Sequence, residues 1–182
     1  AIGMLTSLSL PPFNYFLINF FTFTFFFLFL LKKSSQCKSK RFFFLYGWLF
    51  GFGYFVTNLY WISISLTFDQ NYKFLIPFSF FLIPSFLALF YGFVSFLFLI
   101  YKPRSIISSI ILFSLIFGVL EFIRGTILTG FPWNLIAYSF STQLEFVSVI
   151  TFIGTYGFNL LCISLFTSPA IFLLRNKDTK RY

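Results

Sequence analysis

Long apolar stretches separated by short polar gaps dominate this sequence. The stretches cover approximately residues 1–10, 13–31, 42–66, 74–101, 106–123 and 146–174. A helix needs roughly 20 apolar residues, at about 1.5 Å rise each, to cross the hydrocarbon core of a bilayer. The first stretch is too short, and we expect it to be the end of a helix that begins upstream. The pattern predicts an all-α polytopic membrane protein, a bundle of five full transmembrane helices plus a partial first one.

The composition agrees with a surface that faces lipid. Hydrophobic residues make up 59% of the chain and charged residues only 9%, whereas soluble domains carry about 25% charged residues. Phenylalanine alone contributes 35 of the 182 residues. Lipid-facing positions accept any large apolar side chain, so these runs do not indicate a cofactor-binding motif. No cofactor is predicted.

The net charge of +9 has a topological explanation rather than a nucleic-acid one. Eleven basic residues follow the second, fourth and sixth stretches: Lys32, Lys33, Lys38, Lys40, Arg41, Lys102, Arg104, Arg175, Lys177, Lys180 and Arg181. Only Lys73 and Arg124 fall on the other side. The positive-inside rule predicts that the loops Lys32–Arg41, Lys102–Arg104 and Arg175–Arg181 are cytoplasmic. The segment that contains Trp133 is then periplasmic.

The cysteines indicate neither a disulfide nor a metal site. Cys37 lies in a basic gap and Cys162 inside an apolar stretch, so we expect no bridge between them. Two cysteines without any histidine do not supply the ligands of a zinc site, and no metal is predicted. A thiolate at Cys162 would be disfavoured by its apolar surroundings.

Glycine and proline positions predict how two of the helices pack. Gly47 and Gly51 are four residues apart, a spacing that lets another helix approach closely. Pro77 and Pro84 lie in the stretch 74–101, where we expect a kink or a broken helix start.

Two opposite charges stand at the outward end of the stretch 106–123. Glu121 and Arg124 are three residues apart, so on a helix they share a face and can pair. An unpaired charge at that depth would be unfavourable. The pair either anchors the helix end or takes part in a functional site, and the sequence leaves both interpretations open.

A loop with aromatic residues follows this pair. Gly130 and Pro132 interrupt the helical pattern, and Trp133 and Tyr138 are residue types that favour the membrane interface. Backbone that re-enters the membrane must be covered by protein or face water. We predict a lipid or substrate entrance shaped by Glu121, Arg124, Gly130, Phe131, Pro132, Trp133, Asn134 and Tyr138.

These motifs resemble the signature of the apolipoprotein N-acyltransferases. The resemblance is carried by Glu121-x-x-Arg-Gly, Thr129-Gly-Phe-Pro-Trp-Asn134, Tyr138-Ser139, Tyr60-Trp61-Ile62, the spacing of Pro77 and Pro84, and Gly154-x-x-Gly157 before Asn159. It extends over essentially the whole chain. The segment Gly-Phe-Pro-Trp in this context is its most specific part.

The resemblance implies a bacterial inner-membrane enzyme of lipoprotein maturation. Members of that family transfer a fatty acyl group from a membrane phospholipid to the N-terminal diacylglyceryl-cysteine of an apolipoprotein. A cysteine thiolate first takes the acyl chain as a thioester, which the α-amino group then attacks. Glutamate and lysine assist, and all three residues belong to a nitrilase-like domain before the last span.

The catalytic glutamate, lysine and cysteine of the family have no counterpart in residues 1–182. The nitrilase-like domain is absent from this chain, and we expect a fragment of a longer reading frame that is inactive alone. Two other functions are compatible with the residues. A small transporter or permease would use Glu121 and Arg124 as a polar relay, and a structural membrane subunit would dock a partner on the outward loop.

Overall fold

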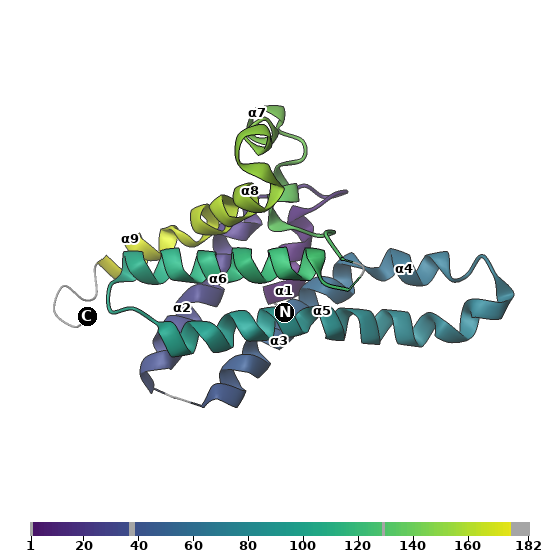
Figure 1. The fold of residues 1–182 in the computed structure, drawn as a ribbon, viewed down its shortest axis with the longest axis horizontal. Coiled ribbons are helices and arrows are strands. Elements are labelled where there is room, and N and C mark those ends of the chain that lie inside the picture. The colour runs from purple at the N-terminus through teal and green to yellow at the C-terminus, as the bar shows by residue number, and fades with distance from the viewer. Residues whose placement is uncertain (1, 37–38, 129, 176–182) are drawn as a thin grey trace.

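The computed structural model describes residues 2–36, 39–128 and 130–175. Within these ranges all regular structure is helical and no strand occurs, which confirms the all-α fold class. Figure 1 shows the helices gathered into one bundle, with α7 and the start of α8 projecting at the top of the view. Cys37, Lys38, Thr129 and the basic residues beyond Arg175 lie outside the described residues.

The α-helices differ in length, and 3-10 helices connect several of them. In chain order they are α1 Ile2–Thr6, η1 Ser7–Ser9, α2 Ile18–Gln36, α3 Lys40–Asn58, α4 Tyr60–Ser65, η2 Gln70–Leu75, α5 Ile76–Tyr101, α6 Ile106–Thr126, η3 Ile136–Phe140, α7 Leu144–Val147, α8 Ile150–Thr167 and α9 Pro169–Arg175.

Three of the described segments are long and apolar enough to cross a membrane, judged by length and composition. They are Gln70–Tyr101, Ile106–Thr126 and Ile150–Leu174. The helices α2 and α3 are not among them, although each has 19 residues. Both carry basic residues where they approach one another, at the end of α2 and the start of α3. That α2 and α3 also span the membrane stays a prediction.

Two of the predicted stretches are interrupted. The stretch 42–66 forms α3 and α4, because the backbone leaves helical geometry at Leu59, with φ −105° and ψ 10°. The stretch 146–174 corresponds to the end of α7, all of α8 and most of α9, and Gly154 inside α8 has a φ of +72°. This left-handed conformation suits glycine and breaks the regular helix there. The regular part of α8 therefore lies after Gly154.

The prolines of α5 do not divide it. Pro77 stands in the first turn, where its missing N–H is not needed by the helix. Pro84 lies inside a helix that continues to Tyr101. The 3-10 helix η2 precedes this start and is capped by Asp69, whose carboxylate accepts a hydrogen bond from the amide of Asn71 at 2.9 Å. Near Pro77 the helix therefore changes from the 3-10 helix η2 to the α-helix α5, which begins at Ile76.

The helices α3 and α5 pack closely along glycines, as their spacing predicted. A Cβ placed on Gly47 would overlap the main-chain oxygen of Tyr91 and the hydroxyl of Ser95. A Cβ on Gly51 would lie 2.8 Å from the Cβ of Tyr91. Contacts this short need glycine, because no larger residue leaves room for the backbone of α5. The contact between α3 and α5 at these glycines keeps Tyr91 in the interior, where its side chain is 1% exposed.

Aromatic rings fill the space between α2, α3 and α6. Phe26 stacks on Phe50 with ring centroids 4.2 Å apart, and its ring also meets that of Phe113 at 5.9 Å. By contrast, Phe21 and Phe25 of the same helix α2 are largely exposed. The phenylalanine surplus therefore serves both the core and the outer surface of the bundle.

The basic connections gather at one end of the bundle. Figure 1 shows the end of α2, the start of α3, the α5–α6 connection and α9 toward the left of the view. The α4–α5 connection lies at the opposite, right-hand end. Lys102 and Arg104 belong to the α5–α6 connection and Lys40 and Arg41 to the start of α3. The charge asymmetry along the sequence thus corresponds to an asymmetry in space.

Candidate functional site

The last turns of α6 hold a buried ion pair. Glu121 and Arg124 are 1% and 2% exposed. The Nε and Nη2 atoms of Arg124 both donate to Oε2 of Glu121, with the Nε distance at 3.1 Å. The predicted pairing is confirmed. Burial of two charges is tolerated because each compensates the other and because further polar groups accept the remaining hydrogen bonds of the guanidinium.

Those further groups belong to the loop after α6. Nη1 of Arg124 donates to the carbonyl oxygens of Phe131 at 2.7 Å and Trp133 at 3.1 Å. The amide of Phe131 in turn donates to the carbonyl oxygen of Arg124 at 3.1 Å. The rings of Phe55 and Phe131 lie 5.3 and 5.9 Å from the guanidinium carbon. Arg124 therefore determines the path of the loop as well as neutralising Glu121.

The loop follows an unusual backbone path. Leu128, Gly130 and Asn134 all have positive φ, at 56°, 73° and 60°. At Gly130 a side chain would also meet the carbonyl oxygen of Gly125 at 2.6 Å, so glycine is required there. The buried hydroxyl of Tyr54 on α3 donates to the carbonyl oxygen of Asn134 at 2.9 Å. The loop is therefore held from both α6 and α3.

Two side chains hold the 3-10 helix η3 that follows. The Asn159 side chain, buried in α8, accepts a hydrogen bond from the amide of Ala137 at 3.0 Å. Burial raises the pKa of the Tyr138 hydroxyl above its usual value. The Tyr138 hydroxyl donates to the carbonyl oxygen of Pro132 at 3.3 Å.

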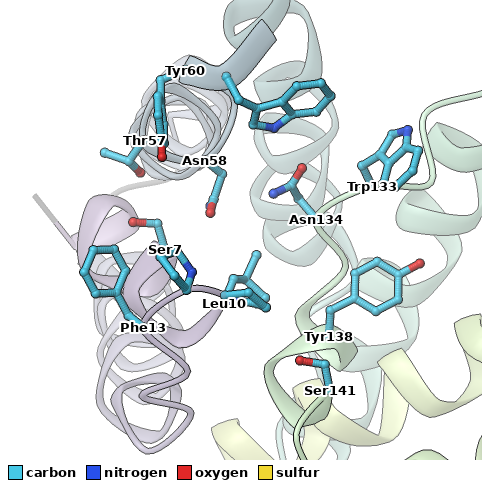
Figure 2. A pocket seen from close by; sticks show the side chains of 13 residues that line it. Ser7, Leu10, Phe13, Thr57, Asn58, Tyr60, Trp133, Asn134, Tyr138 and Ser141 are labelled. Carbon is cyan, nitrogen blue, oxygen red and sulfur yellow. The ribbon is translucent and has the colours of Figure 1, made fainter. Parts of the chain in front are cut away.

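A cavity of about 560 Å³ opens beside this loop. It is lined by Ser7, Leu10, Pro11, Pro12, Phe13, Thr57, Asn58, Tyr60, Trp61, Trp133, Asn134, Tyr138 and Ser141. Figure 2 shows the N-terminal segment facing the loop across the cavity, with the end of α3 and the start of α4 above. The turn at Pro11 and the segment of Trp133 thus meet at one cavity.

The predicted entrance residues divide into two groups. Trp133, Asn134 and Tyr138 line the cavity. The other five, Glu121, Arg124, Gly130, Phe131 and Pro132, are not among its lining residues. Glu121 and Arg124 form the buried pair, and the carbonyl oxygens of Phe131 and Pro132 accept hydrogen bonds within the loop region.

Sequence reasoning did not place Tyr54, Asn58 and Asn159 in the site. Asn58 lines the cavity, whereas Tyr54 and Asn159 hold the backbone of the loop and of η3. A single amide such as Asn159 within an apolar stretch is the signal that could have identified it, because isolated polar groups at membrane depth need a partner. Tyr54 gave no such signal among its aromatic neighbours.

The cavity is suited to an amphipathic molecule. Its walls combine the rings of Trp61, Trp133 and Tyr138 with the polar side chains of Asn58 and Asn134. Trp133 is 59% exposed, so its ring is free to contact a molecule that enters. Binding sites of this size are typically apolar with a few polar groups that orient the ligand.

Among the described residues, no cysteine lines this cavity. Cys162 is a free thiol that is buried within α8, and Cys37 lies outside the described residues. The cavity is lined by hydroxyls, amides, aromatic rings and the apolar side chains of Leu10, Pro11 and Pro12. The arrangement can bind and orient a molecule, and no nucleophilic thiol is available among the described residues of its wall.

Comparison with known proteins gives one consistent result. Residues 2–166 match the family described as apolipoprotein N-acyltransferase N-terminal domain. Similar curated proteins include the apolipoprotein N-acyltransferase of Rhodopseudomonas palustris, which is 35% identical over 98% of this chain and 34% of the relative's length. The apolipoprotein N-acyltransferase of Rhizobium etli is 33% identical over 93% of this chain and 33% of the relative's length. The apolipoprotein N-acyltransferase of Brucella melitensis is 31% identical over 93% of this chain and 33% of the relative's length.

The match confirms the resemblance seen in the motifs. This chain spans about a third of the length of the curated relatives that it matches. The matched region includes α1 through most of α8, and hence the buried ion pair, the loop and the cavity. The chain belongs to the apolipoprotein N-acyltransferase N-terminal domain family.

Proposed function

We propose that this chain is the membrane part of an enzyme that transfers a fatty acyl group from a phospholipid to the N-terminal diacylglyceryl-cysteine of apolipoproteins. The observation that carries the proposal is the cavity lined by Trp133, Asn134 and Tyr138, within a chain of this family. In this role the cavity admits the lipid-linked part of a substrate, and the chain supplies no reacting group.

The chemistry of the cavity supports a lipid-linked substrate. Both the phospholipid donor and the diacylglyceryl-cysteine acceptor join acyl chains to a polar head. Aromatic walls with amide groups suit such a molecule, because rings pack on the chains and amides bind the ester or peptide groups. The acyl transfer itself requires a nucleophile beyond the described residues of the cavity wall, so we expect residues 1–182 to be inactive alone.

We propose a topology in which the basic end of the bundle faces the cytoplasm and the cavity faces the periplasm of a bacterial inner membrane. The positive-inside rule supports this orientation, since Lys40, Arg41, Lys102 and Arg104 lie toward one end. A cavity on the periplasmic side would be open to an exported apolipoprotein.

Cysteine labelling tests this topology. In a variant without native cysteines, Ser141→Cys at the cavity is expected to react with a membrane-impermeant maleimide in intact cells whose outer membrane has been permeabilised. Ser35→Cys at the end of α2 is expected to react only after the inner membrane is opened. Both positions are exposed. Equal labelling of the two sites in intact cells would rule out the orientation.

Trp133→Ala tests the function of the cavity. Made in the complete enzyme, this substitution is expected to lower kcat/KM for acyl transfer about ten- to a hundredfold. The reason is the loss of one aromatic ring that packs on the substrate, a contact that contributes about 1.5–3 kcal/mol to binding. The thermal midpoint should change little, because the ring is more exposed than buried. Thin-layer analysis of the acylated lipoprotein gives the rate.

Phe68→Ala is the matched control for this variant. Phe68 is an aromatic residue that is 87% exposed, belongs to the α4–α5 connection and does not line the cavity. We expect its activity to stay within twofold of the unmodified enzyme. Normal activity in Trp133→Ala would exclude Trp133 from the substrate path.

The geometry does not favour a transporter. The guanidinium of Arg124 is occupied by Glu121 and two loop carbonyls, so the pair forms an anchor rather than a relay open to a pathway. A transporter would be supported only if Arg124→Ala abolished uptake of a substrate while N-acylation of lipoproteins continued.

A further inference from the structure

A second groove lies between α3 and α5, toward the N-terminal end of α3. It has a volume of about 280 Å³ and is lined by Lys40, Arg41, Phe44, Phe93 and Phe96. The cavity described above meets α3 at Thr57 and Asn58, 17 residues beyond Lys40 and Arg41, or about 25 Å along a helix. The two sites are therefore at opposite ends of α3.

The walls of the groove are aromatic. Phe44 and Phe93 meet edge to face with centroids 5.2 Å apart. Gly92 allows this approach, because a Cβ there would lie 2.9 Å from the ring of Phe44. Phe93 is 45% exposed, so the groove opens on the surface of the bundle. An acyl chain is the ligand that such a wall accepts within a membrane.

The end of the groove is cationic, and no acidic side chain among the described residues pairs with it. Lys40 and Arg41 are exposed in the first turn of α3, and neither forms an ion pair with a described residue. Cations in a first turn oppose the helix dipole. A bound anion would satisfy both side chains and also the helix terminus, which gives the site a preference for a negative head group.

We propose that this groove binds one anionic phospholipid, with its phosphate at Lys40 and Arg41 and an acyl chain along Phe44, Phe93 and Phe96. The proposal rests on the proposed membrane topology, in which this end faces the cytoplasmic leaflet. Basic sites between helices at that leaflet recognise anionic head groups. The bound lipid is distinct from a substrate at the cavity, because the groove and the cavity lie at opposite ends of α3.

Another groove, on α5, serves as a comparison for the cationic groove. It is lined by Pro77, Phe78, Phe81, Leu82 and Ser85 and has a volume of about 310 Å³. Its size and aromatic walls match those of the cationic groove, but none of the described residues that line it is charged. We expect lipid to occupy it without preference for the charge of the head group.

Native mass spectrometry of this chain tests the proposal. The protein is equilibrated with equal amounts of phosphatidylglycerol and phosphatidylcholine of the same acyl chains, and the retained lipids are counted. We expect phosphatidylglycerol to be retained preferentially. The double substitution Lys40→Gln and Arg41→Gln should reduce that preference roughly tenfold or more, since each basic residue contributes to binding the phosphate.

Lys32→Gln with Lys33→Gln is the matched control. It removes the same charge near the end of α2, and neither residue lines the groove. We expect the control to keep its preference for phosphatidylglycerol. The proposal is overturned if both double variants lose the preference equally, or if neither does. Circular dichroism establishes that each variant retains its helices before lipids are counted.

A photoactivatable phosphatidylglycerol locates the lipid. Crosslinks are expected in the peptides of Phe44 and Phe93, and they should disappear in the variant without Lys40 and Arg41. Crosslinks confined to the loop of Trp133 would contradict the proposal. These measurements do not involve acyl transfer, so their outcome is independent of the activity assay on Trp133. A chain recovered without detergent would instead contradict the membrane topology itself.

Discussion

Arg124→Ala is expected to destabilise this protein more than any other single substitution in the loop region. The change leaves the Glu121 carboxylate buried without its cation and removes the donors to the carbonyls of Phe131 and Trp133. Breaking a buried pair on one side costs about 3–5 kcal/mol. Unfolding by sodium dodecyl sulfate in mixed micelles, followed by circular dichroism, measures the loss.

Release of the loop should accompany this loss. Limited proteolysis between α6 and η3 is expected to become faster in Arg124→Ala, because the guanidinium holds the backbone at Phe131 and Trp133. Arg104→Ala removes the same charge from the exposed α5–α6 connection and should change stability by no more than about 0.5 kcal/mol. Equal stability of the two variants would refute this account of Arg124.

A double substitution separates the two contributions of Arg124. With Glu121→Leu and Arg124→Leu together, no buried charge is left without a partner, so less stability should be lost than in Arg124→Ala. Proteolysis of the loop should still be fast, because its carbonyls have no donor. A double variant less stable than the single one would mean that the ion pair itself stabilises the fold.

Gly47→Ala is expected to give the second large effect, because it acts where α3 and α5 pack most closely. The added methyl group overlaps the main-chain oxygen of Tyr91 and the hydroxyl of Ser95. A main-chain oxygen cannot rotate away, so the helices must separate. Overpacking of this kind costs about 3 kcal/mol, the upper part of the usual range. The same mixed-micelle titration measures it.

Gly118→Ala is the matched control for Gly47→Ala. Gly118 lies in α6, and its nearest neighbours are side-chain atoms of Leu160 at 3.1 Å, which can shift. Both substitutions add the same methyl group and gain the same helix propensity, about 1 kcal/mol. We expect Gly118→Ala to be near neutral. A similar loss in the two variants would show that the backbone contact at Gly47 is not limiting.

Local features of the sequence were sufficient to predict the helices and several of their contacts. The spacing of Glu121 and Arg124 predicted their ion pair, and the spacing of Gly47 and Gly51 predicted a close helix contact. The break at Gly154 was not predicted, because glycine is common in membrane helices and only its φ of +72° distinguishes it. Helix ends were misplaced where apolar residues continue past a turn, as at Leu59.

The residues of the candidate site were predicted as a segment, but not their individual places. Trp133, Asn134 and Tyr138 reach the cavity, while Phe131 and Pro132 contribute carbonyls to the interactions behind it. That division depends on positive φ values at three loop residues and on hydrogen bonds from Tyr54 and Asn159. Tyr54 is 80 residues from its partner in the loop, so no local pattern could reveal the contact.

The amino-acid sequence by itself determined a helical membrane protein, its sorted basic residues, its ion pair and its family. Only the tertiary structure decided which of its many phenylalanines are internal, since Phe26 is buried and Phe25, its neighbour in α2, is 56% exposed. In a helix that is apolar on every face, hydropathy carries no direction. The direction comes from the neighbouring helices, which pack where glycine and aromatic shapes allow close contact.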